Sequence, residues 1–427
     1  MMSTSLLNRY GLIVLAVAAV VHAEHTWAQR APDTVVVAVH GAIHTIADGV
    51  AQASRGGVVR VRAGIYREPT VEIHQPLTLV GDSGAVLDGD ERRELLIVNA
   101  DSVTVRGFEF RNTGTSQVTD RAAVHVIESS ACTIDHNRFI NTLFGIYLQR
   151  ASGCQILDNV LDGRVGSQSV TGNGIHLWSS RDNFIARNVI RGHRDGIYFE
   201  FVRNSIVRGN LSEGSHRYGL HFMFSDSCRY ENNTFRANQS GVAVMYSHVV
   251  AITGNRFSDN RGPSTYGLLL KEITDSEVRH NVFADNSIAL HLEGASRNII
   301  ADNDFARNGW ALRVLADAID NKITGNQFTG NLFDVGTNSR TTQSVIEGNS
   351  WDRYHGYDLN HDGIGDVPYA PVRLFALLVV QSPVALLLVR SAMVDILDVV
   401  ERVMPVFTPT TLVDHAPLMH APRRVLR

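Results

Sequence analysis

The sequence predicts an all-β protein, a right-handed parallel β-helix with an N-terminal cap and a C-terminal helical and extended tail. Three repeating features predict this fold: an asparagine about every 22 residues, an apolar residue three positions before it, and an alternating segment about eight positions after it. Because such a repeat accommodates three short strands and tight turns, we expect equivalent asparagines to stack from coil to coil. The asparagines are Asn137, Asn159, Asn188, Asn210, Asn233, Asn255, Asn281, Asn303, Asn326 and Asn349.

The alternating segments supply one strand of each coil. Their second and fourth residues share one side, as Ile146 and Leu148 do, so we expect these to fill the core and the residues between them to point outward. Two coils are longer than the rest because of insertions at 162–171 and 259–266. The segments are GIYL at 145, GIHL at 174, GIYF at 196, GLHF at 219, GVAV at 241, GLLL at 267, ALHL at 289 and ALRV at 311.

The composition is that of a protein with a sizeable core, and its charge does not favour a nucleic-acid partner. The 427 residues are 44% hydrophobic and 19% charged, which is enough to bury a core. A solenoid of this length needs no division into globular domains, because it grows by adding coils. The net charge is −4, with 39 Lys plus Arg against 43 Asp plus Glu, so we expect no nucleic-acid partner.

Residues 1–28 have the pattern of a secretory signal peptide. Arg9 precedes an apolar run at 11–21, and small residues suited to cleavage follow at Ala23 and Ala28. The alternative is an uncleaved membrane anchor, for which the apolar run is short. We therefore expect an extracytoplasmic mature protein.

The remaining chain divides by its pattern. We expect an N-terminal cap and first coils at 33–110, with a short amphipathic helix at 44–53, and regular coils at 111–355. An Asp/Gly-rich turn at 356–371 follows, and then an apolar helix and tail at 372–427. The caps would cover the open ends of the β-helix against edge pairing.

The C-terminal segment is apolar, but Pro383 and Arg390 interrupt it, so a transmembrane span is not expected. Its helix would either cap the last coil or dock on a membrane partner. The tail after it contains several proline residues and is expected to be extended and exposed, which suits recognition. The residues expected to dock are Leu374, Leu387, Met393, Ile396, Met404 and Met419.

The three cysteines, Cys132, Cys154 and Cys228, each lie five residues before a repeat asparagine. One shared column indicates small core residues with buried thiols. A disulfide between Cys132 and Cys154 on neighbouring coils is the alternative. Neither reading makes these residues catalytic.

The Asp/Gly-rich turn resembles a calcium loop. Its oxygen ligands would come from positions 1, 3, 5, 7 and 9 of the loop, with Gly363 at position 6, but Tyr369 stands where a bidentate carboxylate is expected. A plain turn without calcium is the alternative. The candidate ligands are Asp358, Asn360, Asp362, Ile364 and Asp366.

The outward positions of the alternating segments hold a second candidate metal site. His221 and Met223 share a strand, and Met245 lies one coil further along. One imidazole and two thioethers are a soft donor set that suits Cu(I). His415, Met419 and His420 in the tail form a rival soft set.

The same face could instead be a groove for a partner or a covering loop, or a cleft for a polysaccharide with lyase or epimerase chemistry. Its remaining residues are His176, Trp178, Tyr198, Glu200, Lys271, His291 and Glu293. Glu200 and Glu293 are four coils apart, roughly 20 Å, which is too far for either glycosidase geometry. Catalysis is therefore disfavoured, and no catalytic residue is predicted.

Several stretches together resemble the NosD family, periplasmic maturation proteins for nitrous oxide reductase. These are RDGIYFEFVRNS at 194, RYGLHFMFSDS at 217, GVAVMYS at 241, YGLLLKEITDS at 266 and the DLNHDGIGDVPY turn at 358. The resemblance extends to the signal and the apolar C-terminal segment. The coil repeat alone is less specific, because pectin lyases and other carbohydrate-binding β-helix proteins share it.

The resemblance implies a non-catalytic accessory protein that helps to assemble the copper-sulfide centres of the reductase. Its partners would be an ABC transporter, comprising a membrane subunit and an ATPase, a copper chaperone lipoprotein and the apo-reductase. The protein would lie in the periplasm, attached to the inner membrane through the transporter. A polysaccharide lyase or epimerase and a purely structural adhesin are the alternatives.

Overall fold

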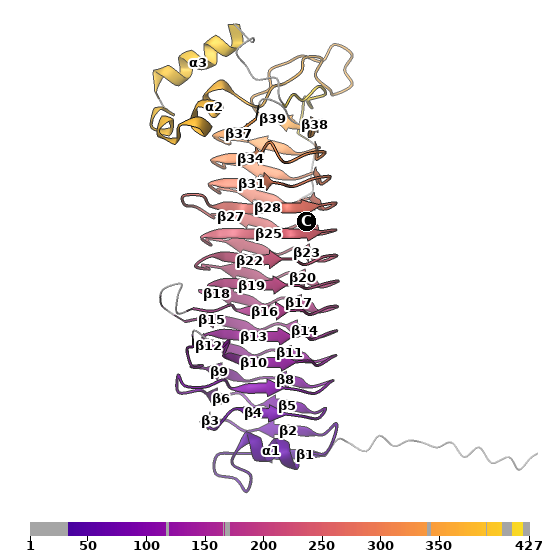
Figure 1. The fold of residues 1–427 in the computed structure, drawn as a ribbon, viewed down its shortest axis with the longest axis vertical. Helices are drawn as coiled ribbons and strands as arrows, with labels where there is room; N and C mark the ends of the chain where they lie inside the picture. The colour runs from indigo at the N-terminus through magenta and orange to yellow at the C-terminus, as the bar shows by residue number, and fades with distance from the viewer. Residues whose placement is uncertain are drawn as a thin grey trace, which may run out of the picture.

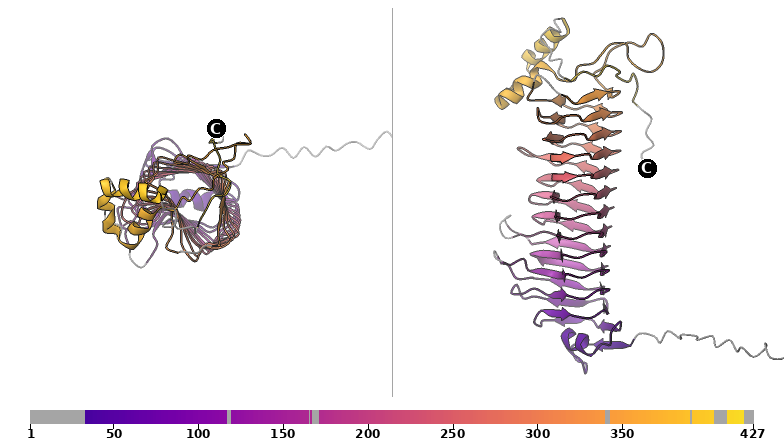
Figure 2. Two further views of the ribbon diagram at one scale, coloured as in Figure 1. Left: turned by 90° about the horizontal axis from the view of Figure 1, so that it is seen from above. Right: turned by 45° about the vertical axis from the view of Figure 1, so that its right-hand side comes forward.

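In a computed structural model, the chain forms one long parallel β-helix (Figure 1). The structure describes residues 33–116, 119–164, 166, 171–339, 343–389, 391–403 and 412–421. The predicted signal peptide at 1–28 and the predicted docking residue Met404 lie outside these ranges. All strand pairs within the three sheets are parallel, and the coils superimpose when the molecule is viewed along its axis (Figure 2). The predicted fold is confirmed.

Each coil contributes one strand to each of three sheets, taken here in chain order. The first sheet contains β1 (Thr34–Val37), β2 (Val58–Val61), β5 (Thr78–Gly81), β8 (Thr104–Arg106), β11 (Thr133–Asp135), β14 (Gln155–Leu157), β17 (Phe184–Ala186), β20 (Ile206–Arg208), β23 (Arg229–Glu231), β26 (Ala251–Thr253), β29 (Glu277–Arg279), β32 (Ile299–Ala301), β35 (Lys322–Thr324) and β38 (Val345–Glu347).

The second sheet follows the repeat asparagines. It contains β3 (Gly64–Tyr66), β6 (Ala85–Asp88), β9 (Glu109–Arg111), β12 (Arg138–Thr142), β15 (Val160–Gly163), β18 (Val189–Arg191), β21 (Leu211–Glu213), β24 (Thr234–Arg236), β27 (Arg256–Ser258), β30 (Val282–Ala284), β33 (Asp304–Ala306), β36 (Gln327–Thr329) and β39 (Ser350–Trp351).

The third sheet is built from the alternating segments. It contains β4 (Val71–Ile73), β7 (Leu96–Val98), β10 (Ala122–Ile127), β13 (Phe144–Gln149), β16 (Ile175–Trp178), β19 (Asp195–Glu200), β22 (Tyr218–Met223), β25 (Ser240–His248), β28 (Tyr266–Thr274), β31 (Ile288–Glu293), β34 (Trp310–Val314) and β37 (Phe333–Gly336). As predicted, the second and fourth residues of each segment are buried, as Leu220 and Phe222 are.

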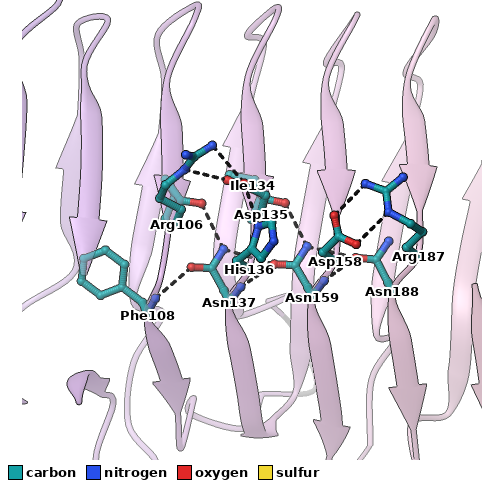
Figure 3. Close-up of polar contacts among 11 residues, drawn as sticks. Arg106, Phe108, Ile134, Asp135, His136, Asn137, Asp158, Asn159, Arg187 and Asn188 are labelled. Carbon is teal, nitrogen blue, oxygen red and sulfur yellow. Dashed lines mark hydrogen bonds and ion pairs between the residues drawn. The ribbon is translucent and has the colours of Figure 1, made fainter. Parts of the chain in front are cut away.

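The repeat asparagines form a buried ladder at the turn between the first and second sheets (Figure 3). Asn137 donates from its backbone N and its Nδ2 to Asn159 Oδ1, at 3.0 and 3.2 Å, and Asn159 does the same to Asn188 Oδ1, at 3.0 Å each. Each Nδ2 also donates to a main-chain carbonyl of an earlier strand, such as Val105 O at 3.0 Å for Asn137. Every amide is therefore satisfied without water, which fixes the register of successive coils.

Two further features stack along the axis. A second asparagine ladder, missed in the sequence, runs at the turn before the third sheet, where Asn260 Nδ2 donates to Asn286 Oδ1 at 2.9 Å. In the core, Phe283 and Phe305 stack at 4.9 Å between ring centroids, and the column ends with Phe328 on Trp351 at 4.1 Å. The three cysteines are buried and free, so the thiol prediction is confirmed and the disulfide alternative is wrong.

The N-terminal end is closed by α1 (Ile46–Gln52). Thr45 caps this helix by accepting from Asp48 N, and Glu68 accepts from Ile46 N and Ala47 N at 2.9 Å each. Ile46, Gly49 and Val50 are buried against the first coils. The helix expected at 44–53 is thus present as a cap.

The other end is covered by α2 (Leu374–Gln381), a 3₁₀ helix (Pro383–Leu388) and α3 (Ala392–Val403) (Figure 1). Phe375, Ala376 and Val379 of α2 pack on Phe333 of the third sheet. The single helix expected here is broken, because Pro383 cannot continue α2. None of the helices in the described ranges is long and apolar enough to cross a membrane.

The tail was expected to be exposed, and that prediction is wrong for Leu412, Asp414 and Pro417, which are buried. His415, His420 and Ala421 are exposed as expected. Leu412 and Asp414 are 1% and 0% exposed. Asp414 Oδ2 accepts from Asn349 N and Trp351 Nε1 at 2.9 Å each, and Oδ1 accepts from Gly348 N at 2.9 Å. Asp414 therefore occupies the place of the next ladder asparagine, because Asn349 has no coil beyond it.

Replacing Asp414 with alanine should loosen the last coil. The Gly348 and Asn349 amides would lose a charged acceptor, which costs roughly 3 kcal/mol locally and should speed their hydrogen exchange by roughly a hundredfold. Asp414→Asn keeps an acceptor oxygen and should have a smaller effect. Unchanged exchange in the alanine variant would contradict the role of Asp414.

Candidate functional site

The outer face of the third sheet carries the residues singled out in the sequence. His176 pairs with Tyr198, Tyr198 with His221, and His221 with Ala243 on successive strands. The rings form a continuous row, with centroids 4.7 Å apart for His176 and Tyr198 and 5.0 Å for Tyr198 and His221. The row stops at Ala243 and Leu269, so His291 lies apart from it.

The outward residues directly after the alternating segments form a second column on this face, and this column brings Met223 and Met245 together. Met223 pairs directly with Met245 on the next strand, and both side chains are half-buried. Paired positions on adjacent strands are about 4.8 Å apart. Tyr198 Oη donates to Met223 Sδ at 3.9 Å. The two methionines therefore lie in register on neighbouring strands and are partly sheltered from solvent, and their role as copper ligands stays a prediction.

His221 lies two residues before Met223 on β22, but it is 5% exposed rather than open to solvent. His221 Nδ1 lies 2.7 Å from Arg217 Nη2 and 3.5 Å from Asp195 Oδ2, so it can accept from Arg217 or donate to Asp195 according to the tautomer of the ring. A metal at Nε2 would require the ring proton on Nδ1, where the Asp195 carboxylate can accept a hydrogen bond.

Asp195 is a buried carboxylate beside His221 on the third sheet. Burial works to raise its pKa, but hydrogen bonds from His221 and Arg217 outweigh burial and hold the pKa below its usual range. The carboxylate thus stays charged and paired with Arg217. Neither Asp195 nor Arg217 was predicted from the sequence as a site residue, although they stand just before the glycines of the segments at 196 and 219.

The groove histidines face outward but are not accessible. His176 and His291 are 8% and 4% exposed, and burial lowers their pKa to about 3 and about 4. Burial likewise raises the pKa of Tyr198 to about 12. At neutral pH these three rings are uncharged, so they form packed, neutral parts of the outer face.

The other groove residues are half-buried and partly paired. Lys271 Nζ lies 2.7 Å from Glu293 Oε1 on the next strand. Trp178 packs against Arg150, whose guanidinium carbon lies 5.6 Å from the ring centroid. Glu200 pairs in register with Met223, next to the thioethers. These contacts bring no second carboxylate beside Glu200.

Elsewhere the predicted metal ligands are not drawn together. Within the part of the chain that the structure describes, no three His, Cys, Asp or Glu side chains form a metal-binding group. In the Asp/Gly-rich turn, Asp358 accepts from Asp362 N and Gly363 N, and Asp362 accepts from Ile364 N. Asp366 accepts from Leu359 N at 2.7 Å. The loop is ordered by its own carboxylates, and the calcium site stays a prediction.

The predicted docking residues divide into two groups. Leu387, Met393 and Ile396 are 85%, 53% and 62% exposed on the C-terminal cap. Leu374 is half-buried under α3, where its N donates to Glu401. Met419 is half-buried in the segment 412–421, which lies over the last coil, and its backbone N donates to Gly363 O at 3.0 Å. An apolar surface thus remains at the end of the cap.

The fold places the chain among parallel β-helix proteins, and its sequence relatives narrow the class. A protein of Stutzerimonas stutzeri and one of Pseudomonas aeruginosa, each named "Probable ABC transporter binding protein NosD", are 30% and 32% identical to this chain. The alignments cover 86% and 87% of this chain and 88% and 90% of those proteins. The chain belongs to the NosD family.

Family models agree with this membership. The model described as "Periplasmic copper-binding protein (NosD)" matches residues 161–356, which include His221, Met223 and Met245. A second model, described as a protein of unknown function (DUF1565), matches residues 56–220. The resemblance noted in the sequence is confirmed.

Solved structures share the fold at low sequence identity. The Dettilon tailspike protein is 16% identical, with a TM-score of 0.55 over 70% of this chain and 65% of its own. A family 28 exopolygalacturonase from Yersinia enterocolitica is 12% identical, with a TM-score of 0.52 over 74% of this chain and 79% of its own. These likenesses show the β-helix alone.

Because His176 is neutral when folded and takes up a proton when unfolded, stability should fall as the pH drops from 6.5 towards 3. By pH 5 the loss from this residue is about 2 kcal/mol. His176→Phe keeps the ring contacts and should reduce the difference in unfolding free energy between pH 7 and pH 5 by that amount, measured with urea. His280→Asn, at an exposed histidine, is the control. An equal pH dependence in His176→Phe and wild type would contradict the assignment.

Proposed function

We propose that this chain is a non-catalytic periplasmic accessory protein that handles copper during assembly of the copper-sulfide centres of nitrous oxide reductase. One observation carries the proposal: Met223 and Met245 are paired on neighbouring strands, with His221 two residues away on the same strand as Met223. Membership of the NosD family supports the reductase as the recipient. Copper is cargo in this role, to be bound and passed on.

The donor atoms of His221, Met223 and Met245 suit Cu(I). Thioether sulfur and neutral imidazole are soft ligands, and the half-buried position of both methionines limits hydration of a bound ion. The nearby rings of Tyr198 and His176 carry no charge at neutral pH, so they would not repel a cation. Asp195 would hold the His221 ring in the tautomer that frees Nε2.

The C-terminal cap supplies the contact with an ABC transporter. The relatives are named as ABC transporter binding proteins, and the exposed Leu387, Met393 and Ile396 form an apolar surface suited to a membrane subunit. The ATPase would join through that subunit. The outer face of the third sheet around Met223 and Met245 would bind a copper chaperone lipoprotein and the apo-reductase. The transporter would hold the protein at the inner membrane.

Replacing both Met223 and Met245 with leucine should abolish tight Cu(I) binding. Leucine keeps the volume and the burial but has no donor atom, so affinity should fall by roughly tenfold or more for each lost ligand, about 1.4 kcal/mol each. Competition against a Cu(I) chelator measures the affinity, and X-ray absorption reports sulfur ligation.

Two matched variants make that result specific. Met393→Leu changes an exposed methionine on the cap and should leave the affinity unchanged. A variant with His415, Met419 and His420 replaced tests the rival donors in the tail. Copper binding that survives in the double leucine variant but is lost in the tail variant would refute the site at Met223 and Met245.

Replacing Leu387 and Ile396 with aspartate should release the protein from the transporter. Both side chains are more than half exposed, so the fold should tolerate the change, whereas a charge in an apolar interface should weaken binding by roughly tenfold or more. Co-purification of the transporter from membranes measures the contact, with Cu(I) affinity as a second readout that should not change.

Ile65→Asp is the matched control, because Ile65 is 45% exposed at the opposite end of the β-helix. Point variants are preferable to deletion of 372–427, since that deletion also removes Asp414 from the last coil. Full retention of the transporter by the Leu387/Ile396 variant would contradict this docking surface.

A further inference from the structure

A polar cleft of about 590 Å³ opens on the outer face of the third sheet, over β7, β10 and β13. It lies three strands before Met223, roughly 14 Å along the axis, so it is separate from the proposed copper site. Its volume is in the range of small-molecule sites. The lining residues are Thr70, Arg92, Arg93, Glu94, Thr119, Asp120, Arg121, His125, Tyr147 and Gln149.

The floor of the cleft is held rigidly. His125 lies between Glu94 Oε1, 2.9 Å from Nδ1, and Gln149 Oε1, 3.0 Å from Nε2. Its ring stacks on Tyr147 with the centroids 4.5 Å apart. Burial raises the pKa of Tyr147 to about 12, so the phenol keeps its proton as a hydrogen-bond donor.

One side of the cleft is lined by arginines from two successive coils. Arg93 donates to Glu68 O at 2.7 Å, and Arg121 donates to Arg92 O at 2.7 Å, so both guanidinium groups are positioned by the main chain. The Arg92 side chain is exposed and has no hydrogen-bond or ion-pair partner among the described residues. An exposed guanidinium beside two that are held in place can pair with an anionic group of a ligand.

The charges of the lining define the ligand. Arg93 is also paired with Asp90 at 3.8 Å, so Arg92 and Arg121 are the guanidinium groups that remain to meet an anion. The acids Glu94 and Asp120 in the lining favour a single carboxylate over a dianionic phosphate, which they would repel more strongly. Glu94 Oε1 and Gln149 Oε1 are bonded to His125, which leaves Glu94 Oε2, the Gln149 amide nitrogen and the Tyr147 hydroxyl to pair with hydroxyl groups.

We propose that this cleft binds a hydroxylated monocarboxylate of the uronic acid type, either free or as one residue of a polysaccharide. Arg92 and Arg121 take the carboxylate, for which the planar guanidinium is suited, and Glu94 and Gln149 take ring hydroxyls. The inference does not depend on copper handling, because none of these residues lies at Met223 or Met245.

Calorimetric titration of the full chain with D-galacturonate, its tetramer and neutral D-galactose tests the proposal. The two acids should bind and galactose should not. Arg92→Gln should weaken binding by roughly tenfold, the scale of one charge-assisted hydrogen bond, without changing the melting temperature. Arg181→Gln is the matched control, since Arg181 is 71% exposed outside the cleft.

Equal affinity for the monomer and the tetramer would support a free hydroxy acid as the ligand, and tighter binding of the tetramer would support a polysaccharide. No binding of either acid at millimolar concentrations would overturn the proposal. Equal binding of galactose, or undiminished binding by Arg92→Gln, would also overturn it. Cu(I) affinity measured on the same variants separates this outcome from the fate of the proposed function.

Discussion

The hydrogen-bonded ladder of buried asparagines is the constraint on which the structure depends. A primary amide in the core has donors and acceptors that cannot be left unpaired, and here each amide is satisfied by the amide of the next coil and by a carbonyl of an earlier one. A shift of one coil by a single residue would break the ladder. The register of all three sheets follows from it, including the pairing of Met223 with Met245.

The ends show the same constraint in another form. A ladder must stop, and the last asparagine still has donors to satisfy. Asp414 meets this need from a segment 65 residues further along the chain. The closure of the β-helix and the apolar cap that we assign to transporter contact therefore belong to one C-terminal unit, since the chain passes through α2 and α3 before it returns to the last coil.

On the outer face of the third sheet, His176 and His221 are buried, and Met223 and Met245 beside them are half-buried. Histidine and tyrosine rings contact one another from strand to strand, so each shields the next from water, and burial keeps His176 neutral. The half-buried methionines stand beside this row, at the point where a soft ion would be sheltered but still reachable. Further towards the N-terminus, the same face holds a cleft lined with arginines.

The sequence by itself determined the coil length, the core face of each strand and the shared strand of His221 and Met223, because these follow from local periodicity. It also revealed the family, through stretches such as RYGLHFMFSDS. The tertiary structure alone decided how deeply His221 is buried, that Arg217 and Asp195 hold it, and that Arg92 and Arg121 meet in one cleft. Burial, tautomer and cleft shape depend on what neighbouring coils and distant segments place around a residue. Periodicity along one chain carries no record of those contacts.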